Sequence, residues 1–162
     1  MRTLRPLLIA ILLMAILCGC TTPSEQEFTC RGLSITLGPE YRDCSREPAG
    51  KNLDFLYVSD QIGFTGVCDS KTQFEELYPG LQLSAYAELT AKNSGIASPV
   101  QIYRGIPYYI YTSNPDGTEY TYLAAAFEGP VTFWLLQCYC KSSEFSALEQ
   151  QIWDALETVR FT

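Results

Sequence analysis

Two long apolar segments near the C-terminus most constrain the fold of this chain. Residues 119–128 and 131–140 carry apolar side chains at odd and even positions alike, as in Leu-Ala-Ala-Ala-Phe at 123–127. Only Gly129 and Pro130 separate the two segments. A strand that is apolar on both faces has to be covered on both faces. The pair therefore predicts two neighbouring central strands of a sheet, with other elements packed above and below.

The spacing of the remaining apolar residues predicts the other elements. Strands are expected at residues 32–37, 53–58, 62–68, 100–103, 107–113 and, in short form, 159–162, a loop at 41–52, a helical turn at 72–78, and helices at 83–92 and from 142 or 143 onward. This order predicts an α+β fold, in which a mainly antiparallel sheet is flanked by helices on both faces. The length of the chain suits a single globular domain over residues 30–162.

The N-terminus is organised like an export signal. Arg2 and Arg5 precede an unbroken apolar run at residues 7–18. This run is shorter than the roughly 20 residues that a helix needs to cross a bilayer. Residues 17–20 (Leu-Cys-Gly-Cys) then resemble the lipobox of bacterial lipoproteins. The resemblance implies cleavage before Cys20 and a diacylglyceryl group on its thiol; an ordinary signal peptide or an uncleaved anchor is the alternative.

The lipobox sets the expected domain boundaries and location. Residues 1–19 would be a removed signal peptide, and residues 20–29 the lipidated Cys20 and a flexible polar tether. Two acyl chains anchor a protein stably, whereas one chain does so only marginally. We therefore expect a protein attached to the cell membrane by its lipid anchor and facing outside the cytoplasm.

The mature chain would be acidic and has no histidine. Loss of Arg2 and Arg5 leaves nine basic against eighteen acidic residues, a net charge of −9. This charge argues against a nucleic-acid partner and against docking on anionic lipid, and it is compatible with cationic partners. The absence of histidine excludes Ser-His and Cys-His nucleophilic sites and histidine metal ligands. We predict no catalytic residue, no metal site and no cofactor.

Beyond residue 20 the chain contains further cysteines, which are disulfide candidates in an exported protein. They are Cys30, Cys44, Cys68, Cys138 and Cys140. Five cysteines allow two bonds and one free thiol, so the sequence does not determine the pairing. An antiparallel meander would bring Cys44 near Cys68, and Cys30 near Cys138 or Cys140. A redox or metal pair at Cys138 and Cys140 is the alternative, although residues two apart on a strand simply face the same way.

Tyrosines are unusually dense in the second half of the chain. Tyr109 and Tyr111 share one face of an expected strand, and Tyr120 and Tyr122 share one face of the next strand. These four side chains could form a platform for a glycan or a peptide, because tyrosine offers a large ring with a polar tip. The alternative interpretation is cross-strand aromatic pairing, which stabilises antiparallel sheets.

Acidic side chains suggest a third possibility, a hydrolase that uses carboxylates alone. The candidates are Glu75, Glu76, Glu144, Glu149, Asp154 and Glu157. Their positions on expected helices are typical of solvated faces. The turn at Asp116 and Gly117 has too few neighbouring oxygens for a calcium loop. We expect none of these residues to be catalytic.

The C-terminal half resembles a known fold family. It contains Gly-Ile-Pro-Tyr-Tyr at 105–109, Tyr-Thr-Tyr-Leu at 120–123 and Phe-Trp-Leu-Leu-Gln-Cys at 133–138, followed by an amphipathic helix. These segments are similar to small exported or lipid-anchored bacterial proteins with the PsbP-like fold. The extrinsic PsbP proteins of photosystem II and the Mog family of Ran-binding proteins share that fold. The resemblance spans residues 32–161 and implies an α-β-α sandwich.

The resemblance carries an expectation about function, although a fold does not determine one. No residue of this chain matches the manganese-, calcium- or Ran-binding features of the better-known members. We expect a non-catalytic binding or assembly role with an unknown protein or glycan partner, for instance as an accessory subunit of a membrane complex. The tyrosine-based glycan or peptide module and the carboxylate-based hydrolase are the alternatives.

Overall fold

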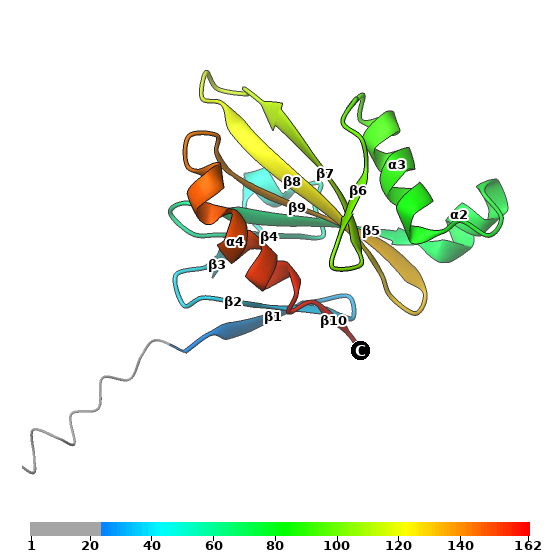
Figure 1. Ribbon diagram of the computed structural model, residues 1–162. Helices are drawn as coiled ribbons and strands as arrows, with labels where there is room; N and C mark the ends of the chain where they lie inside the picture. Colours follow the sequence, from blue (N-terminus) through cyan, green and yellow to red (C-terminus); the bar gives the residue numbers. More distant parts are fainter. Residues whose placement is uncertain (1–23) are drawn as a thin grey trace, which may run out of the picture.

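The computed structural model describes residues 24–162, so the predicted signal segment and Cys20 lie outside the described residues. Two antiparallel sheets organise the chain (Figure 1). The larger sheet has the strand order β3-β4-β5-β9-β8-β7-β6 and the smaller one the order β1-β2-β10.

The strands and helices have the following bounds. The larger sheet contains β3 (Arg42–Asp43), β4 (Phe55–Val58), β5 (Gly63–Ser70), β6 (Gln101–Tyr103), β7 (Ile106–Ser113), β8 (Tyr120–Glu128) and β9 (Thr132–Lys141). The smaller sheet contains β1 (Gln26–Cys30), β2 (Leu33–Leu37) and β10 (Arg160–Phe161). The helices are α2 (Lys71–Leu77), α3 (Leu83–Asn93), α4 (Phe145–Leu156) and the short 3-10 turn η1 (Pro48–Gly50).

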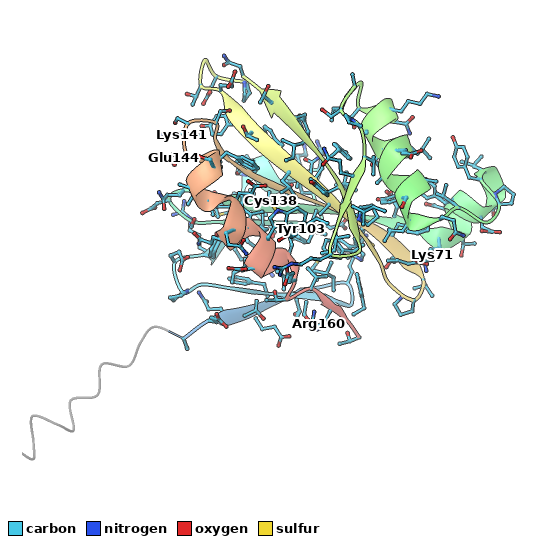
Figure 2. All side chains as sticks on the ribbon, viewed as in Figure 1. Lys71, Tyr103, Cys138, Lys141, Glu144 and Arg160 are labelled. Atoms are coloured by element: carbon cyan, nitrogen blue, oxygen red, sulfur yellow. The ribbon has the colours of Figure 1, made fainter. Side chains whose placement is uncertain are left out.

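The predicted α+β sandwich is confirmed. β8 and β9 are the two long apolar strands, and each is flanked by two other strands of the larger sheet. Leu123 and Ala125 of β8 face a core that includes α4 and the smaller sheet, whereas Ala124 and Ala126 face α3. Side chains fill the space on both faces of the sheet (Figure 2). Because successive side chains of a strand point to opposite faces, the apolar residues of β8 are buried in both layers, as expected for a segment that is apolar throughout.

The tether prediction was wrong for residues 26–29, because these residues belong to β1. β1 pairs along its whole length with β2, from Gln26 opposite Leu37 to Cys30 opposite Leu33. Its polar side chains are exposed, while Phe28 and Cys30 are partly buried. An edge strand needs apolar side chains on one face only. The polar composition that suggested a tether is thus that of an edge strand.

Arg-Gly pairs close two tight hairpins. Arg31 and Gly32 join β1 to β2 with φ values of 46° and 80°. Arg104 and Gly105 join β6 to β7 with φ values of 51° and 85°. Positive φ at both central residues is the type I′ pattern, which matches the twist of the flanking strands. Arg31 also forms an ion pair with Asp54, with 2.8 Å between Nη1 and Oδ1. The residue with the positive φ value therefore also holds its guanidinium group against a carboxylate.

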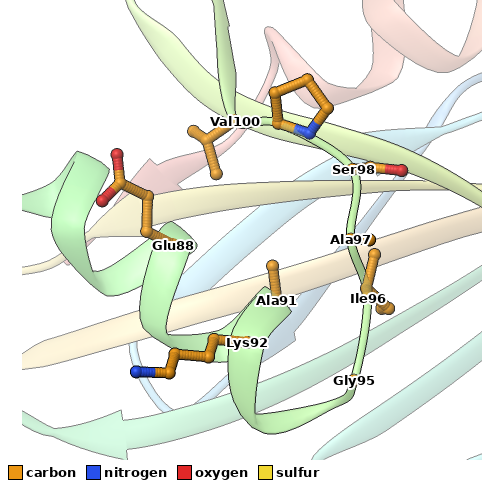
Figure 3. A pocket seen from close by; sticks show the side chains of 9 residues that line it. Glu88, Ala91, Lys92, Gly95, Ile96, Ala97, Ser98 and Val100 are labelled. Carbon is orange, nitrogen blue, oxygen red and sulfur yellow. The ribbon is translucent and has the colours of Figure 1, made fainter.

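Helix α3 covers part of one face of the larger sheet. Tyr86, Ala87 and Ala91 are its buried residues. Gly95 follows the helix with a φ of 70°, a conformation that suits glycine, and residues 96–100 then run back towards β6 (Figure 3).

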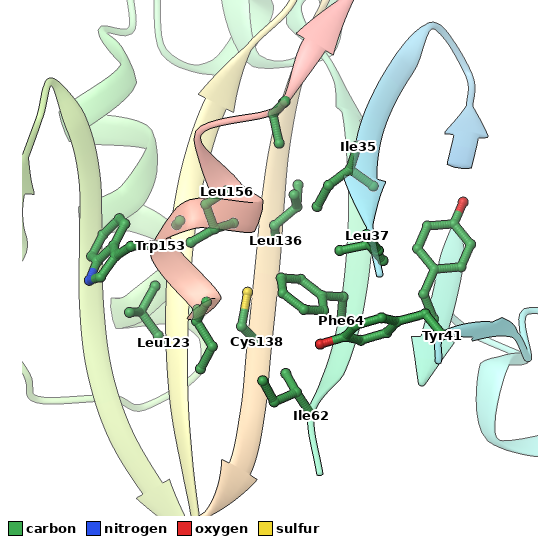
Figure 4. Packing of buried hydrophobic residues seen from close by; sticks show 14 of the residues in the cluster. Ile35, Leu37, Tyr41, Ile62, Phe64, Leu123, Leu136, Cys138, Trp153 and Leu156 are labelled. Atoms are coloured by element: carbon green, nitrogen blue, oxygen red, sulfur yellow. The ribbon is translucent and has the colours of Figure 1, made fainter. Parts of the chain in front are cut away.

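The main core lies on the opposite face (Figure 4). Cys138 is central to it and is paired across the strands with Phe64 on one side and Leu123 on the other. Leu156 of α4 and Ile35 of β2 cover this layer and are fully buried. Helix α4 and the smaller sheet together therefore cover this face of the larger sheet, and α3 covers part of the other face.

Within residues 24–162 no helix combines the length and the apolar character needed to cross a bilayer.

Candidate functional site

A row of three tyrosines crosses the face of the larger sheet that also carries α3. The strand register places Tyr111 of β7 opposite Tyr122 of β8, Tyr122 opposite Tyr139 of β9, and Tyr139 opposite Gly63 of β5. The ring centroids of Tyr111 and Tyr122 are 4.8 Å apart and those of Tyr122 and Tyr139 are 5.5 Å apart. These spacings follow the separation of neighbouring strands, about 4.8 Å. We call Tyr111, Tyr122 and Tyr139 the tyrosine row.

The rings of the row stand on edge. The ring planes of Tyr111 and Tyr122 are within 9° of parallel, and those of Tyr122 and Tyr139 are within 30°. Rings that stack across neighbouring strands turn their faces towards one another. All three residues are partly exposed, and the stacked arrangement turns the faces of Tyr111 and Tyr122 away from solvent and towards each other.

The hydroxyls of the row are hydrogen-bond donors at neutral pH. Burial raises the pKa of Tyr111, Tyr122 and Tyr139 above the usual value, and in each case the neighbouring tyrosines raise it further. A raised pKa keeps the phenol protonated. The row can therefore donate to carbonyl or carboxylate oxygens of a ligand.

A hollow of about 210 Å³ lies beside the row. Tyr120 borders it and packs edge-on against Tyr139, with 6.2 Å between the ring centroids. Charged residues also line the hollow, namely Asp60, Lys141 and Glu144; Figure 2 shows the last two near the start of α4. The surface next to the row thus combines aromatic edges with both signs of charge.

The predicted platform is corrected at one position. Tyr111, Tyr120 and Tyr122 are brought together and are partly exposed. Tyr109 is fully buried, with 0% of its surface exposed, and it belongs to the core beneath α3. It shares a face with Tyr111, as predicted, but α3 covers that part of the face. Sequence reasoning missed Tyr139, which the register of β9 with β8 places opposite Tyr122.

A second aromatic group lies on the other face of the sheet and was also missed. Trp153 of α4 contacts Tyr103 and Tyr108, with centroid distances of 4.5 and 4.9 Å. The three residues border a hollow of about 310 Å³. Trp153 is only 4% exposed, so most of its indole serves the packing of α4 on the sheet.

A further hollow, of about 500 Å³, lies between the second half of α3 and residues 95–100 (Figure 3). Small and aliphatic residues make most of its lining, with Glu88 and Lys92 as the charged groups. This composition gives shape and apolar surface but no arrangement of convergent polar groups for chemistry.

The predicted hydrolase carboxylates are engaged in local contacts or lie apart. Glu75 accepts a hydrogen bond from the Gly80 backbone N–H at 3.1 Å, and Asp154 accepts one from Gln150 at 2.7 Å. Glu157 pairs with Arg104. Glu76 is exposed, and Glu144 and Glu149 are partly exposed on the segment around the start of α4. Among the described residues, no cluster of three or more His, Cys, Asp or Glu side chains is arranged to hold a metal ion.

The five candidate cysteines are free thiols in this structure. The predicted proximity of Cys44 to Cys68 is wrong. The Cys44 N–H donates to the Leu56 oxygen at 2.7 Å, and Leu56 is opposite Thr65, three residues before Cys68 in β5. Three residues of a strand span about 10 Å, beyond the reach of a disulfide. The sequence did not reveal the short strand β3, whose pairing with β4 sets the position of Cys44.

The predicted proximity of Cys30 to Cys138 or Cys140 is wrong as well. Cys30 contacts Asp54, which also accepts a hydrogen bond from the Cys68 backbone, and Cys68 is opposite Trp134 in the sheet. Cys138 is four residues further along β9, about 13 Å at the rise of a strand. The α-carbons of a disulfide lie within about 7 Å of each other. The prediction failed because β1 and β2 form a separate sheet and are not neighbours of β9.

Comparison with solved structures identifies the type of fold. No protein-family model and no curated protein matches the chain. A cyanobacterial PsbP (CyanoP) from Synechocystis sp. PCC 6803 has a TM-score of 0.53 at 8% identity, over 89% of this chain and 96% of that one. The fold is PsbP-like.

Two further solved structures show the same architecture. The Ran-binding protein Mog1p of Saccharomyces cerevisiae has a TM-score of 0.51 at 8% identity, over 85% of this chain and 95% of that one. A protein of Bacteroides thetaiotaomicron has a TM-score of 0.54 at 10% identity, over 88% of this chain and 49% of that one. At these identities the likeness concerns the fold alone.

Proposed function

We propose that this protein is a lipid-anchored, extracytoplasmic binding module that docks a protein partner and performs no covalent chemistry. The lipobox-like residues 17–20 and the basic, apolar leader before them support the anchor and the location. The PsbP-like fold supports a binding role, since Mog1p, with the same fold, is a Ran-binding protein. The tyrosine row carries the proposal for the docking surface.

The orientation of the row favours a protein over a glycan. Sugars pack on open ring faces, but the faces of Tyr111 and Tyr122 are turned towards each other at 9° from parallel. The row offers phenol donors instead, which suit the carbonyl and carboxylate oxygens of a polypeptide. Tyrosine is enriched in protein interfaces because one side chain supplies apolar area and a hydrogen-bonding tip. The net charge of −9 expected after cleavage favours a basic partner.

Site-specific photo-crosslinking of the full chain in its own cells tests this surface. A photoreactive phenylalanine analogue at Tyr120, beside the row, is expected to give one defined protein adduct. The same analogue at Tyr103, on the opposite face of the sheet, is the matched control and should give no adduct. Combining the Tyr120 probe with Tyr111→Phe, Tyr122→Phe and Tyr139→Phe removes the hydroxyls and keeps the rings, and it should lower the adduct yield at least tenfold.

Three results would count against the docking proposal. Equal adducts at both probe positions would show no preference for this face. An unchanged adduct yield in the triple phenylalanine variant would show that the hydroxyls do not contribute to docking. Displacement by soluble cell-wall polysaccharide would indicate a glycan-binding module instead. The thermal unfolding of each variant, measured alongside, separates loss of binding from loss of fold.

The anchor has its own test. Cys20→Ala should move the protein from the membrane to the soluble fraction or leave the leader uncleaved. Cys18→Ala is the matched control and should change neither processing nor fractionation. Unchanged membrane attachment and processing in Cys20→Ala would contradict the anchor without affecting the docking proposal.

A further inference from the structure

Asp54 brings two cysteines together. The Cys30 thiol donates a hydrogen bond to the backbone oxygen of Asp54, with 3.3 Å between Sγ and O. The Cys68 backbone N–H donates to the Asp54 carboxylate, with 2.6 Å between N and Oδ2. Arg31, next to Cys30, pairs with the other carboxylate oxygen at 2.8 Å. A single residue therefore holds the segments that carry both thiols.

The two thiols come from different sheets. Cys30 is the last residue of β1 in the smaller sheet, and Cys68 lies in β5 of the larger sheet. Both side chains pack at the margin of the main core and are partly exposed. Cys44, Cys138 and Cys140, by contrast, are at most 3% exposed. Cys30 and Cys68 are thus the accessible pair.

The same two charged residues, Asp54 and Arg31, act on both thiols. Burial and the Asp54 carboxylate raise the pKa of both thiols, while Arg31 lowers the pKa of both. The Cys68 thiol further raises the pKa of Cys30. The pKa of each thiol is raised overall, and Arg31 offsets part of that rise by favouring the thiolate at either sulfur.

We propose that Cys30 and Cys68 form a disulfide that joins the β1–β2 hairpin to the larger sheet. The thiolate of one cysteine attacks a sulfur of an external disulfide, forming a mixed disulfide and releasing one thiolate. The second cysteine loses its proton and attacks the mixed disulfide, which completes the Cys30–Cys68 bond and releases the second external thiol. Two thiols are oxidised and one external disulfide is reduced, so the oxidant belongs to the class of small-molecule or protein disulfides.

Non-reducing peptide mapping of the full-length protein in detergent tests this pairing. The protein is equilibrated with mixtures of reduced and oxidised glutathione, and free thiols are then blocked with N-ethylmaleimide. In the oxidising mixture we expect a cross-linked peptide containing Cys30 and Cys68, with the other three described cysteines blocked only after unfolding. The melting temperature of the protein should rise on oxidation and return to its starting value on reduction.

Variants provide the matched controls. Cys30→Ser with Cys68→Ser should abolish the rise in melting temperature on oxidation, whereas Cys44→Ser should retain it. The wild-type map requires no variant, so it stands even where a serine variant folds poorly. Three outcomes would overturn the proposal: a bond from Cys30 to any other cysteine, glutathione adducts without a cross-link, or two thiols that stay free in the oxidising mixture.

Discussion

The Tyr139 ring occupies the space above Gly63 where a side chain on that residue would lie. Gly63 is the cross-strand partner of Tyr139, and the tyrosine row therefore ends on a residue without a side chain. The glycine lets the ring lean onto β5 and close the row against the sheet. A β-carbon at this position would compete with the ring for the same volume.

Gly63→Ala should displace Tyr139 and lower the free energy of unfolding by about 1–3 kcal/mol, since overpacking forces a side chain from its position. Near-ultraviolet circular dichroism should report the change in the tyrosine row. In a Tyr139→Ala background the same substitution should lower the free energy of unfolding by much less, because the competing ring is absent. Gly38→Ala is the control, since the atoms nearest to its added β-carbon belong to the movable carboxylate group of Glu40. Equal costs of Gly63→Ala in both backgrounds would refute this account.

Two buried tyrosines in the layer between α3 and the sheet, one on each side, should respond differently to loss of the hydroxyl. Tyr86 and Tyr109 are both 0% exposed. The Tyr86 hydroxyl donates to Asp69 Oδ2 at 2.8 Å. The Tyr109 hydroxyl has no hydrogen-bond partner among the described residues. Burial raises its pKa, and nearby Thr90 offsets part of that rise.

Tyr86→Phe should therefore lower the free energy of unfolding by about 1.5–3 kcal/mol, the range for a hydrogen bond to a charged group. Tyr109→Phe should leave it unchanged or raise it, because the substitution removes an unpaired buried polar atom. Chemical denaturation of the two variants in parallel measures the contrast. A loss on Tyr109→Phe as large as that on Tyr86→Phe would show that its hydroxyl is paired in solution.

Thr158 connects the end of α4 to the smaller sheet. Its hydroxyl accepts a hydrogen bond from the Thr36 backbone N–H at 2.9 Å and donates to the Ala155 oxygen at 2.6 Å. Thr158→Val keeps the shape but leaves the Thr36 N–H without this partner, at an expected cost of about 1–3 kcal/mol. Thr158→Ser keeps the hydroxyl and should therefore lower the free energy of unfolding clearly less than Thr158→Val does. Similar unfolding midpoints for the two variants in urea would contradict this role.

The reactivity of Cys30 and Cys68 should follow the charges around them. Asp54 raises the pKa of both thiols, so Asp54→Asn should lower both values and shift the pH profile of alkylation to lower pH. Arg31 lowers both values, so Arg31→Ala should shift the profile to higher pH. The thiolate is the reacting form, which makes the iodoacetamide rate a direct measure of each shift. Asp60→Asn is the control, and shifts of the same sign for Asp54→Asn and Arg31→Ala would contradict the assignment.

The layers of the fold were predictable from the sequence, because the apolar pattern is local information. The doubly apolar segments became β8 and β9, and the helical spacing after residue 83 became α3. Long-range pairing was not predictable in the same way. β2 pairs with β10, which is the other end of the chain, and no local pattern encodes that partnership. The wrong proximity of Cys30 to Cys138 or Cys140 follows from the separation of β1 and β2 into this second sheet, which no local pattern encodes either.

The candidate site was predictable in part for the same reason. Strand alternation correctly placed Tyr120 and Tyr122 on one face. Whether a residue on that face meets solvent depends on how far α3 extends over the sheet, and this decided the burial of Tyr109. Tyr139 joined the row through the register of β8 with β9, which depends on the turn between them.

The arrangement of the smaller sheet has a mechanical consequence. β1 and β10 both run antiparallel to β2, so the chain enters this sheet at the Gln26 end and leaves it at the opposite end, where the Thr162 N–H donates to the Gly32 oxygen. Opposing forces on Gln26 and Thr162 would therefore act along the strand axis at opposite ends of this sheet. They would load the β1–β2 hydrogen bonds in shear, all at once, rather than peel them apart one after another.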